Sequence, residues 1–371
     1  MYFGVMLTGY FMQFFNNRFF LIIFTLILAI LGFFRYGIGI DYFAYQFLYD
    51  RLLPNIFEEI KYGVDFQETG FRALGSFLKG LGFSYQAYLI VLMSVTMFFM
   101  YKIVKRYSLN PTLSMLLFFC FYYLTWTFSG VRQGLVIAVG LYFLLKYIEE
   151  KKGIRLVVVS ILLSFIHTSA LSLILYYLLS KLNFNRKSLI VITIFSVIVS
   201  FLPTGNLVSQ MTFLPFFSDL FPYIETGVGV NFLDFQSISR LVFLAVALIF
   251  YNVYADQNEM SKKIMNIYIF STIIYLLFQF SELTAARIAI FGKFLDIIIF
   301  ANVLYLYRES INKLLYIYAI FILCSLYLVK EVDTQITSTV ENNSILAPYP
   351  TVFNGDDSRY NYLNSYKNLT D

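Results

Sequence analysis

Apolar runs long enough to cross a membrane recur along most of this chain, and they restrict its fold more than any other feature. A helix needs roughly 20 apolar residues to span a bilayer, and its backbone groups must all bond internally there. The runs cover 19–34, 84–101, 111–128, 131–148, 156–180, 188–202, 241–254, 264–280, 288–306 and 314–329. With the apolar residues 1–15, they predict an all-α, polytopic transmembrane helical bundle of about 10–12 membrane segments.

The composition excludes a soluble protein. Charged residues make up 13% of the chain, against about 25% in soluble domains. One histidine and two cysteines, both within apolar runs, predict no metal site, no disulfide and no cofactor. The first residues lack the basic start and cleavage site of a signal peptide.

Basic residues in the short loops predict the topology, because Lys and Arg gather on the cytoplasmic side. The connections 35–83, 129–133, 203–240, 281–287 and 330–371 carry fewer basic than acidic residues, and we place them outside. The other loops are predominantly basic and are placed in the cytoplasm, so the net charge of +5 indicates topology and no nucleic-acid partner. Residues 1–329 then form the membrane domain, with outer loops 35–83 and 203–239, and 330–371 form an outer polar tail.

The run 156–180 fits this topology only if the chain enters the membrane and returns to the same side. A single crossing would invert every later loop, and 25 helical residues extend only about 37 Å, too short for two crossings. We therefore expect a broken, re-entrant hairpin with its tip near His167.

Residues suited to phosphate chemistry fall on the predicted outer side. The planar fork of arginine matches phosphate oxygens, and four arginines lie near the ends of apolar runs: Arg35, Arg132, Arg240 and Arg287. Three residues are candidate general bases: His167, Asp41 and Glu68. Each residue also has a structural interpretation. The arginines suit interface anchors or ion pairs, the carboxylates suit solvated residues or partners of Arg35 and Arg72, and the histidine suits a hydrogen-bonded core position.

Six sequence motifs occur in an order that resembles the EpsG-type family of Wzy-like O-antigen and exopolysaccharide polymerases. They are FRYGIGIDYFAYQF (34–47), ETGFRAL (68–74), GVRQGLVIAV (130–139), LLSFIHTSALSLILYYLL (162–179), SELTAARIAIFGKFLDIIIFANVL (281–304) and LAPYPTVF (346–353). The chain departs from the family pattern in having Gly-Ile-Asp where Gly-Thr-Asp is usual, and in its short first span.

The resemblance implies a multi-pass glycosyltransferase of the bacterial inner membrane, with a GT-C-like fold and no metal. It implies that donor and acceptor are oligosaccharides linked to undecaprenyl diphosphate, used on the periplasmic side, with a chain-length-regulating co-polymerase as a further partner. On this interpretation Arg132 and Arg287, then Arg35 and Arg240, bind the pyrophosphate. His167, Asp41 or Glu68 takes the acceptor proton, and direct displacement inverts the anomeric centre.

Three other functions remain open at this point. An O-antigen ligase would use the same donor with another acceptor. A membrane O-acyltransferase would use a membrane histidine, but an acyl donor does not call for a row of arginines. A flippase for lipid-linked oligosaccharides would show repeated halves and charges deep in the membrane, whereas most charges here lie at the ends of runs.

The topology is testable by cysteine labelling. Single cysteines at Ser237 and Asn343 should react with an impermeant thiol reagent in spheroplasts, because both positions are predicted to lie outside. A cysteine at Asn258 should be protected until the cells are lysed. Labelling at Asn258 with protection of the other two positions would contradict the topology.

Overall fold

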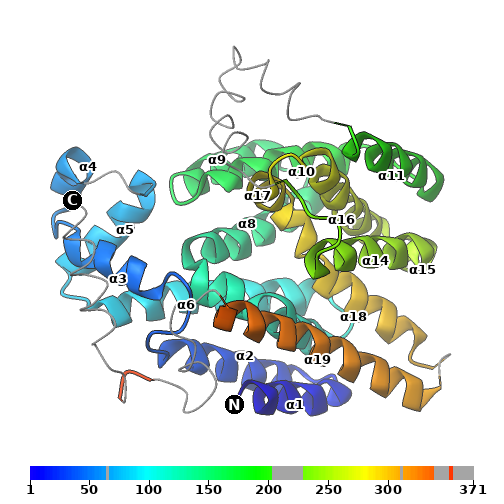
Figure 1. Ribbon diagram of the computed structural model, residues 1–371, viewed down its shortest axis with the longest axis horizontal. Coiled ribbons are helices and arrows are strands. Elements are labelled where there is room, and N and C mark those ends of the chain that lie inside the picture. Colours follow the sequence, from blue (N-terminus) through cyan, green and yellow to red (C-terminus); the bar gives the residue numbers. More distant parts are fainter. Residues whose placement is uncertain (64–66, 203–228, 310–311, 338–350, 354–371) are drawn as a thin grey trace. The chain divides into compact units, whose positions relative to one another are not determined.

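The computed structural model describes residues 1–63, 67–202, 229–309, 312–337 and 351–353, and the described chain is helical (Figure 1). Within these residues the β-type pairing is an isolated antiparallel bridge between Arg35 and Thr351. The chain divides into two compact units. The first comprises the described parts of Met1–Tyr142, Ile161–Thr168 and Tyr307–Asp371, and the second those of Phe143–Ser160 and Ser169–Leu306.

The first unit contains the amino-terminal helices and the last helix. Its elements are α1 (Tyr2–Met12), η1 (Gln13–Phe15), α2 (Arg18–Phe33), α3 (Tyr42–Arg51), α4 (Ile56–Tyr62), α5 (Thr69–Gly80), α6 (Tyr85–Tyr107), α7 (Pro111–Phe118), the π-helix η2 (Phe119–Ser129), the first part of α8 (Val131–Glu149), the end of α9 (Gly153–Ser164) and α19 (Lys313–Thr337). Polar side chains cap the amino-terminal ends of several of these helices. At α6, for example, the Ser84 hydroxyl accepts a hydrogen bond from the Ala87 N–H. Helix α1 packs against α2, α7 and α19, and α2 packs against α6.

The second unit is built around one buried helix. Its elements are the remainder of α8 and α9, η3 (Thr168–Leu171), α10 (Ser172–Lys181), α11 (Arg186–Ser200), α14 (Phe235–Ile249), α15 (Tyr251–Ala255), α16 (Glu259–Leu277), α17 (Glu282–Lys293) and α18 (Asp296–Tyr307). Helices α10, α11, α14, α15 and α17 all contact α16. Every residue of α16 from Ile264 to Leu276 is buried, which fits a stretch that is predominantly apolar on all sides.

The described residues form both full-length and shorter apolar helices. Four described helices are long and apolar enough to cross a membrane: α6, Pro111–Ser129, α8 and Lys313–Gln335 of α19. Helices α17 and α18, bent by 42° at a break, make a fifth if they form one broken span. Other apolar runs form helices of 10–17 residues, including α2 and α9. Hydropathy locates apolar segments but not the breaks within them. The all-α, multi-pass class is confirmed, while the predicted number of membrane segments, which include short and broken ones, stays a prediction.

The chain folds into a helical hairpin around residues 156–180, while the re-entry of this hairpin into the membrane stays a prediction. Helix α9 ends at Ser164, and the chain turns through η3 into α10. The Ser160 hydroxyl donates to the Ala170 carbonyl over 2.6 Å. Gly153, which begins α9, lies against the ring of Tyr177 near the end of α10, since a Cβ there would lie 2.5 Å from the ring. Helices α9 and α10 therefore run antiparallel.

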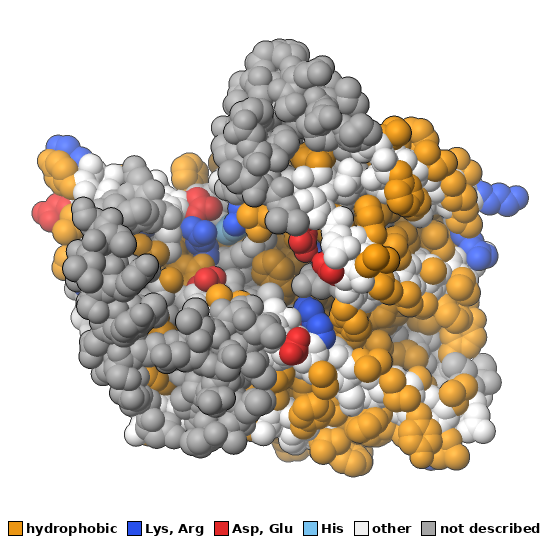
Figure 2. All heavy atoms as spheres, in the orientation of Figure 1, with side chains coloured by type: hydrophobic (Ala, Val, Ile, Leu, Met, Phe, Trp, Pro, Cys, Tyr) orange, Lys and Arg blue, Asp and Glu red, His pale blue; other side chains and the backbone are white. Residues whose placement is uncertain are grey.

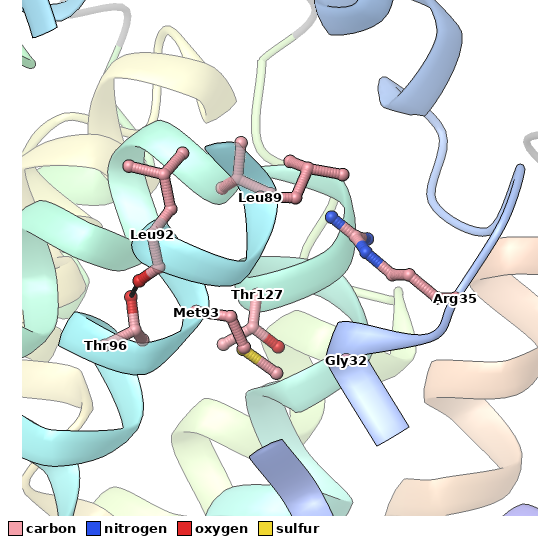
Figure 3. Close-up of a pocket in the computed structure, with 8 residues that line it drawn as sticks. Gly32, Arg35, Leu89, Leu92, Met93, Thr96 and Thr127 are labelled. Atoms are coloured by element: carbon pink, nitrogen blue, oxygen red, sulfur yellow. Dashed lines mark hydrogen bonds between the residues drawn. The ribbon is translucent and has the colours of Figure 1, made fainter. Parts of the chain in front are cut away.

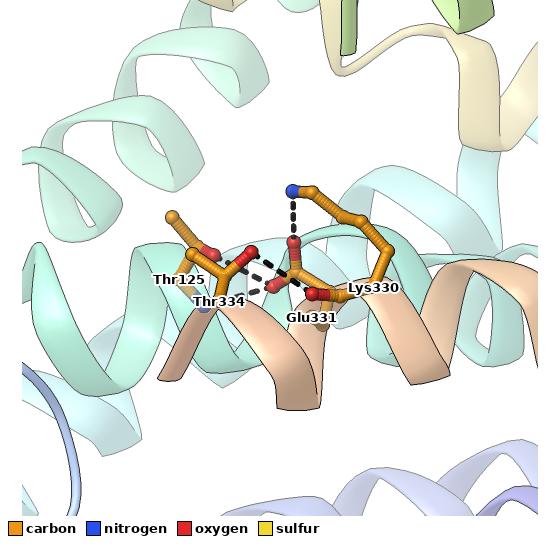
Figure 4. A network of polar contacts seen from close by, with 4 residues as sticks. All are labelled: Thr125, Lys330, Glu331 and Thr334. Carbon is orange, nitrogen blue, oxygen red and sulfur yellow. Dashed lines mark hydrogen bonds and ion pairs between the residues drawn. The ribbon is translucent and has the colours of Figure 1, made fainter. Parts of the chain in front are cut away.

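Helix α19 holds the π-helix through buried polar contacts (Figure 4). The Glu331 carboxylate is 1% exposed and accepts from the Thr125 N–H (3.0 Å) and hydroxyl (2.8 Å). Lys330 pairs with it over 2.9 Å. π-Helices are rare and occur frequently at functional sites. Because α19 continues to Thr337, the expected tail boundary at residue 330 falls inside a helix.

We predict that Glu331→Ala destabilises the protein by about 1–3 kcal/mol, because the half-buried Thr125 donors lose their charged acceptor. The single tryptophan, Trp126, follows Thr125 in the π-helix, so its fluorescence should report the change. The apparent unfolding temperature in detergent should fall by several degrees. Glu309→Ala, at an exposed carboxylate, is the control. Equal unfolding temperatures in the two variants would contradict the stabilising role of the Glu331 contacts with the π-helix.

Candidate functional site

Arg35 lies in a tight buried environment. It is 3% exposed, donates to the carbonyls of Ile38 (2.9 Å) and Phe128, and lies 4.5 Å from the Phe128 ring centre. Figure 3 shows its guanidinium directed into a cavity of about 10 Å³ lined by α2, α6 and π-helix residues. Such a volume accommodates about one water molecule, not a pyrophosphate. The geometry therefore favours a structural role for Arg35 over the predicted phosphate contact.

The turn after Arg35 places Asp41 at the start of α3. The Ile40 N–H donates to the Ser129 hydroxyl at the end of the π-helix (3.0 Å). Gly39, at φ +112°, permits this close approach, because a Cβ there would lie 2.5 Å from the Phe128 carbonyl oxygen. The glycines of GIGID therefore shape a turn that carries a carboxylate.

Glu68 joins three segments of the first unit. It precedes α5, forms an ion pair with Arg132 in the first turn of α8, and accepts from the Thr168 N–H over 3.3 Å. At the start of α5, the backbone N–H groups of Gly70 (2.8 Å) and Phe71 (3.2 Å) both donate to the Phe165 carbonyl at the same hairpin tip. Two predicted site residues are thus in direct contact, and both lie beside the predicted tip.

Asp41 and Tyr45 complete this cluster. They lie four residues apart, on one side of the beginning of α3. Desolvation raises the pKa of the Asp41 carboxyl, and attraction to Arg132 partly offsets the rise, although the residue remains accessible to solvent. Desolvation likewise raises the pKa of Tyr45 to about 12, although the hydrogen bond of Tyr45 with Arg132 acts to lower it. Tyr45 is therefore a neutral partner of the arginine.

Arg132 keeps unused donor capacity. One side of its guanidinium pairs with Glu68, while its buried Nε–H has no hydrogen-bond partner among the described residues. The guanidinium carbon also lies 5.9 Å from the ring centre of Phe71. Figure 2 shows basic and acidic side chains beside the pale blue of the histidine on this face. The guanidinium, with a spare donor, can bind an anion. The accessible carboxylate beside it can accept a proton at the adjacent position.

His167 is buried at the hairpin tip. It is 4% exposed, and its backbone N–H donates to the Leu163 carbonyl (3.0 Å). The neighbouring Ile166 packs against the core formed by α3, α5, α6 and α8, while Thr168 contacts Glu68. The structure therefore brings His167 into the segment that Glu68 holds.

Arg240 and Arg287 belong to the second unit. Arg240 in α14 is buried, stacks 3.9 Å from the Tyr275 ring centre, and has an Nε–H with no partner within the described chain. Arg287 is half-buried on α17. Ser237, chosen for labelling, is also buried and lies 3.2 Å from the Tyr275 hydroxyl. Exposed Asn231 is therefore the better labelling position on this segment.

Several residues that contact the predicted site residues could not be identified from the sequence. Arg72 pairs with buried Glu59 (3.1 Å) and not with Glu68. Tyr45 could have been found from its i+4 spacing to Asp41, whereas nothing local in the sequence singles out Glu59. In the part of the chain that the structure describes, no three His, Cys, Asp or Glu residues come together in a way that could hold a metal ion.

Fold and cluster together define a multi-pass helical membrane protein with a charged site in its first unit. A family model described as the EpsG family matches residues 17–349, and the chain therefore belongs to the EpsG family. A search of curated proteins and a search of solved structures each found no match. The family fits a role like that of a polysaccharide polymerase.

We predict that Glu68→Ala loosens the hairpin tip, because Thr168 N–H and Arg132 lose their shared acceptor. Amide hydrogen exchange in residues 165–168 should become faster, while exchange in α16 stays unchanged. Glu58→Ala, at an exposed glutamate of α4, serves as the control. Unchanged exchange at the tip would show that Glu68 does not hold it.

Proposed function

We propose that this protein is a Wzy-like polysaccharide polymerase of the GT-C type in the bacterial inner membrane. It transfers the growing glycan from undecaprenyl diphosphate to the sugar of another lipid-linked repeat unit, on the periplasmic side. The observation that carries this proposal is the contact of Arg132 with Glu68 beside the accessible carboxylate of Asp41. Membership of the EpsG family supports it.

The reaction needs a proton acceptor and a site for negative charge. The acceptor hydroxyl oxygen attacks the anomeric carbon of the donor, and the bond from that carbon to the pyrophosphate oxygen breaks. The electron pair leaves with undecaprenyl diphosphate, the hydroxyl proton passes to a base, and the anomeric centre is inverted. Arg132 stabilises the charge that develops on the leaving oxygen, because guanidinium donors at such a position lower the transition-state energy.

Asp41 suits the role of base better than the two other candidates. Glu68 already accepts from Arg132 and Thr168, and His167 is buried. Asp41 is accessible, and its raised pKa makes it a stronger base than an ordinary aspartate. We assign Glu68 and His167 to positioning the hairpin tip. Arg240 and Arg287 are proposed as further pyrophosphate ligands, to be tested one at a time.

We predict that Arg132→Lys lowers polymerisation by about 10²–10³-fold, because a forked donor is replaced by a point charge. The assay uses purified protein and lipid-linked repeat unit, with products resolved as a ladder. Arg106→Lys, at an exposed arginine, is the matched control. A rate near wild type for Arg132→Lys would show that this arginine is only an anchor.

The pH profile distinguishes the candidate bases. A base acts when deprotonated, so the rate should fall as the pH falls through the pKa of Asp41, which lies above the ordinary value of about 3.9. We predict that Asp41→Asn loses about 10²–10⁴-fold in rate, whereas His167→Gln keeps the acidic limb of the wild type. If His167→Gln removed that limb and Asp41→Asn retained it, His167 would be the base.

A further inference from the structure

A cavity of about 420 Å³ opens between α3, α5 and α6 in the first unit. Its volume lies within the range of small-molecule sites. Its wall combines aromatic rings with polar groups, among them Tyr36, Tyr49, Phe83, Gln46, Asp50 and Lys79. The site described above does not use these side chains.

Gln46 gives the strongest indication of a ligand. Its amide oxygen is buried and has no hydrogen-bond partner among the residues that the structure describes. A carboxamide has two donor hydrogens and a carbonyl acceptor, and leaving such a buried group unpaired is unfavourable. Nearby Gln86, in contrast, accepts from the Tyr42 hydroxyl (3.2 Å) and donates to a backbone carbonyl. In the wall, the amide oxygen and nitrogen of Gln86 are both hydrogen-bonded, whereas the amide oxygen of Gln46 has no partner among the described residues.

The charges of the wall argue against an anionic ligand. The ammonium group of Lys79 donates to the carbonyls of Tyr49 (3.1 Å) and Asp50 (2.7 Å), so it completes the carboxyl end of α3. The Asp50 side chain is exposed and would repel a phosphate. A ligand rich in hydroxyls and with apolar C–H faces fits better, because hydroxyls pair with amide and carboxylate groups while its faces cover aromatic rings.

Helix α3 connects this cavity to the charged cluster. Tyr42, Gln46 and Tyr49 lie at helical spacing along the cavity, and Asp41 and Tyr45 lie on the adjacent stripe of the same helix. Helix α3 therefore carries neutral hydrogen-bonding groups along the cavity and the candidate base, Asp41, on the adjacent stripe.

We propose that this cavity binds a sugar unit of the oligosaccharide substrate, with the Gln46 carboxamide bonded to its hydroxyls. This inference rests on the proposed function, since it specifies where that substrate is held. Binding here would place a neighbouring hydroxyl of the glycan near Asp41.

The test measures binding without chemistry. The probe is the lipid-free oligosaccharide released by mild acid from the cell's own polymer, titrated into the purified protein and followed by saturation-transfer NMR. Gln46→Leu should weaken binding about fivefold to tenfold, the effect of one or two lost hydrogen bonds. Gln257→Leu, the same change at an exposed glutamine outside the cavity, should bind like wild type. Phe83→Ala, at a partly exposed ring, is a second variant whose folding is easier to retain, and it should also bind more weakly.

Equal affinity of wild type, Gln46→Leu and Phe83→Ala, each shown to be folded, would overturn the proposal. That result would leave the polymerase assignment standing if Gln46→Leu still makes a normal ladder. Conversely, loss of oligosaccharide binding in Gln46→Leu supports the cavity even if lipid-linked units prove not to be polymerised, so the two hypotheses fail separately.

Discussion

The arrangement of the first unit depends on the polar anchoring of the π-helix at its carboxyl end. Arg35 donates to the Phe128 carbonyl from one side, and Glu331 accepts from Thr125 on another. Backbone groups in an apolar environment require such partners, because no water is available there. The anchored end positions the turn that carries Asp41 and the start of α8 that carries Arg132. The structural contacts of Arg35 and Glu331 thus bring Asp41 and Arg132 together.

The charged residues of this unit differ in what remains available to a substrate. Arg35 donates to buried carbonyls, and Arg72 pairs with Glu59 with only 5% of its side chain exposed, against 19% for the side chain of Arg132. Arg132 keeps a buried Nε–H without a partner among the described residues, and Asp41 is accessible to solvent. Our proposal that the cluster of Asp41, Tyr45, Glu68 and Arg132 performs the chemistry rests on this difference, and not on the number of arginines on one side.

Much of the fold and part of the site could be predicted from the sequence. Apolar runs predicted the helical membrane class, and the parity of basic loops predicted the hairpin between α9 and α10. The sequence singled out Arg132 at the start of an apolar run and Glu68 within the predicted outer loop 35–83, and the structure places these two side chains in direct contact. Their pairing was not predictable, since 64 residues separate them and nothing in either motif specifies the partner. The break between α17 and α18, the burial of Arg35 and the cavity beside Gln46 likewise depend on tertiary packing, which local patterns do not contain.

We propose that the chain alone joins lipid-linked repeat units, using the energy of the bond to pyrophosphate. The most direct measurement supplies purified protein with undecaprenyl-diphosphate-linked repeat unit as sole substrate, in the presence of a metal chelator, and follows both glycan length and released undecaprenyl diphosphate. We expect a ladder of products, one equivalent of undecaprenyl diphosphate released per linkage, and inverted anomeric configuration at each new bond. Product formation only after a nucleotide sugar is added would contradict it.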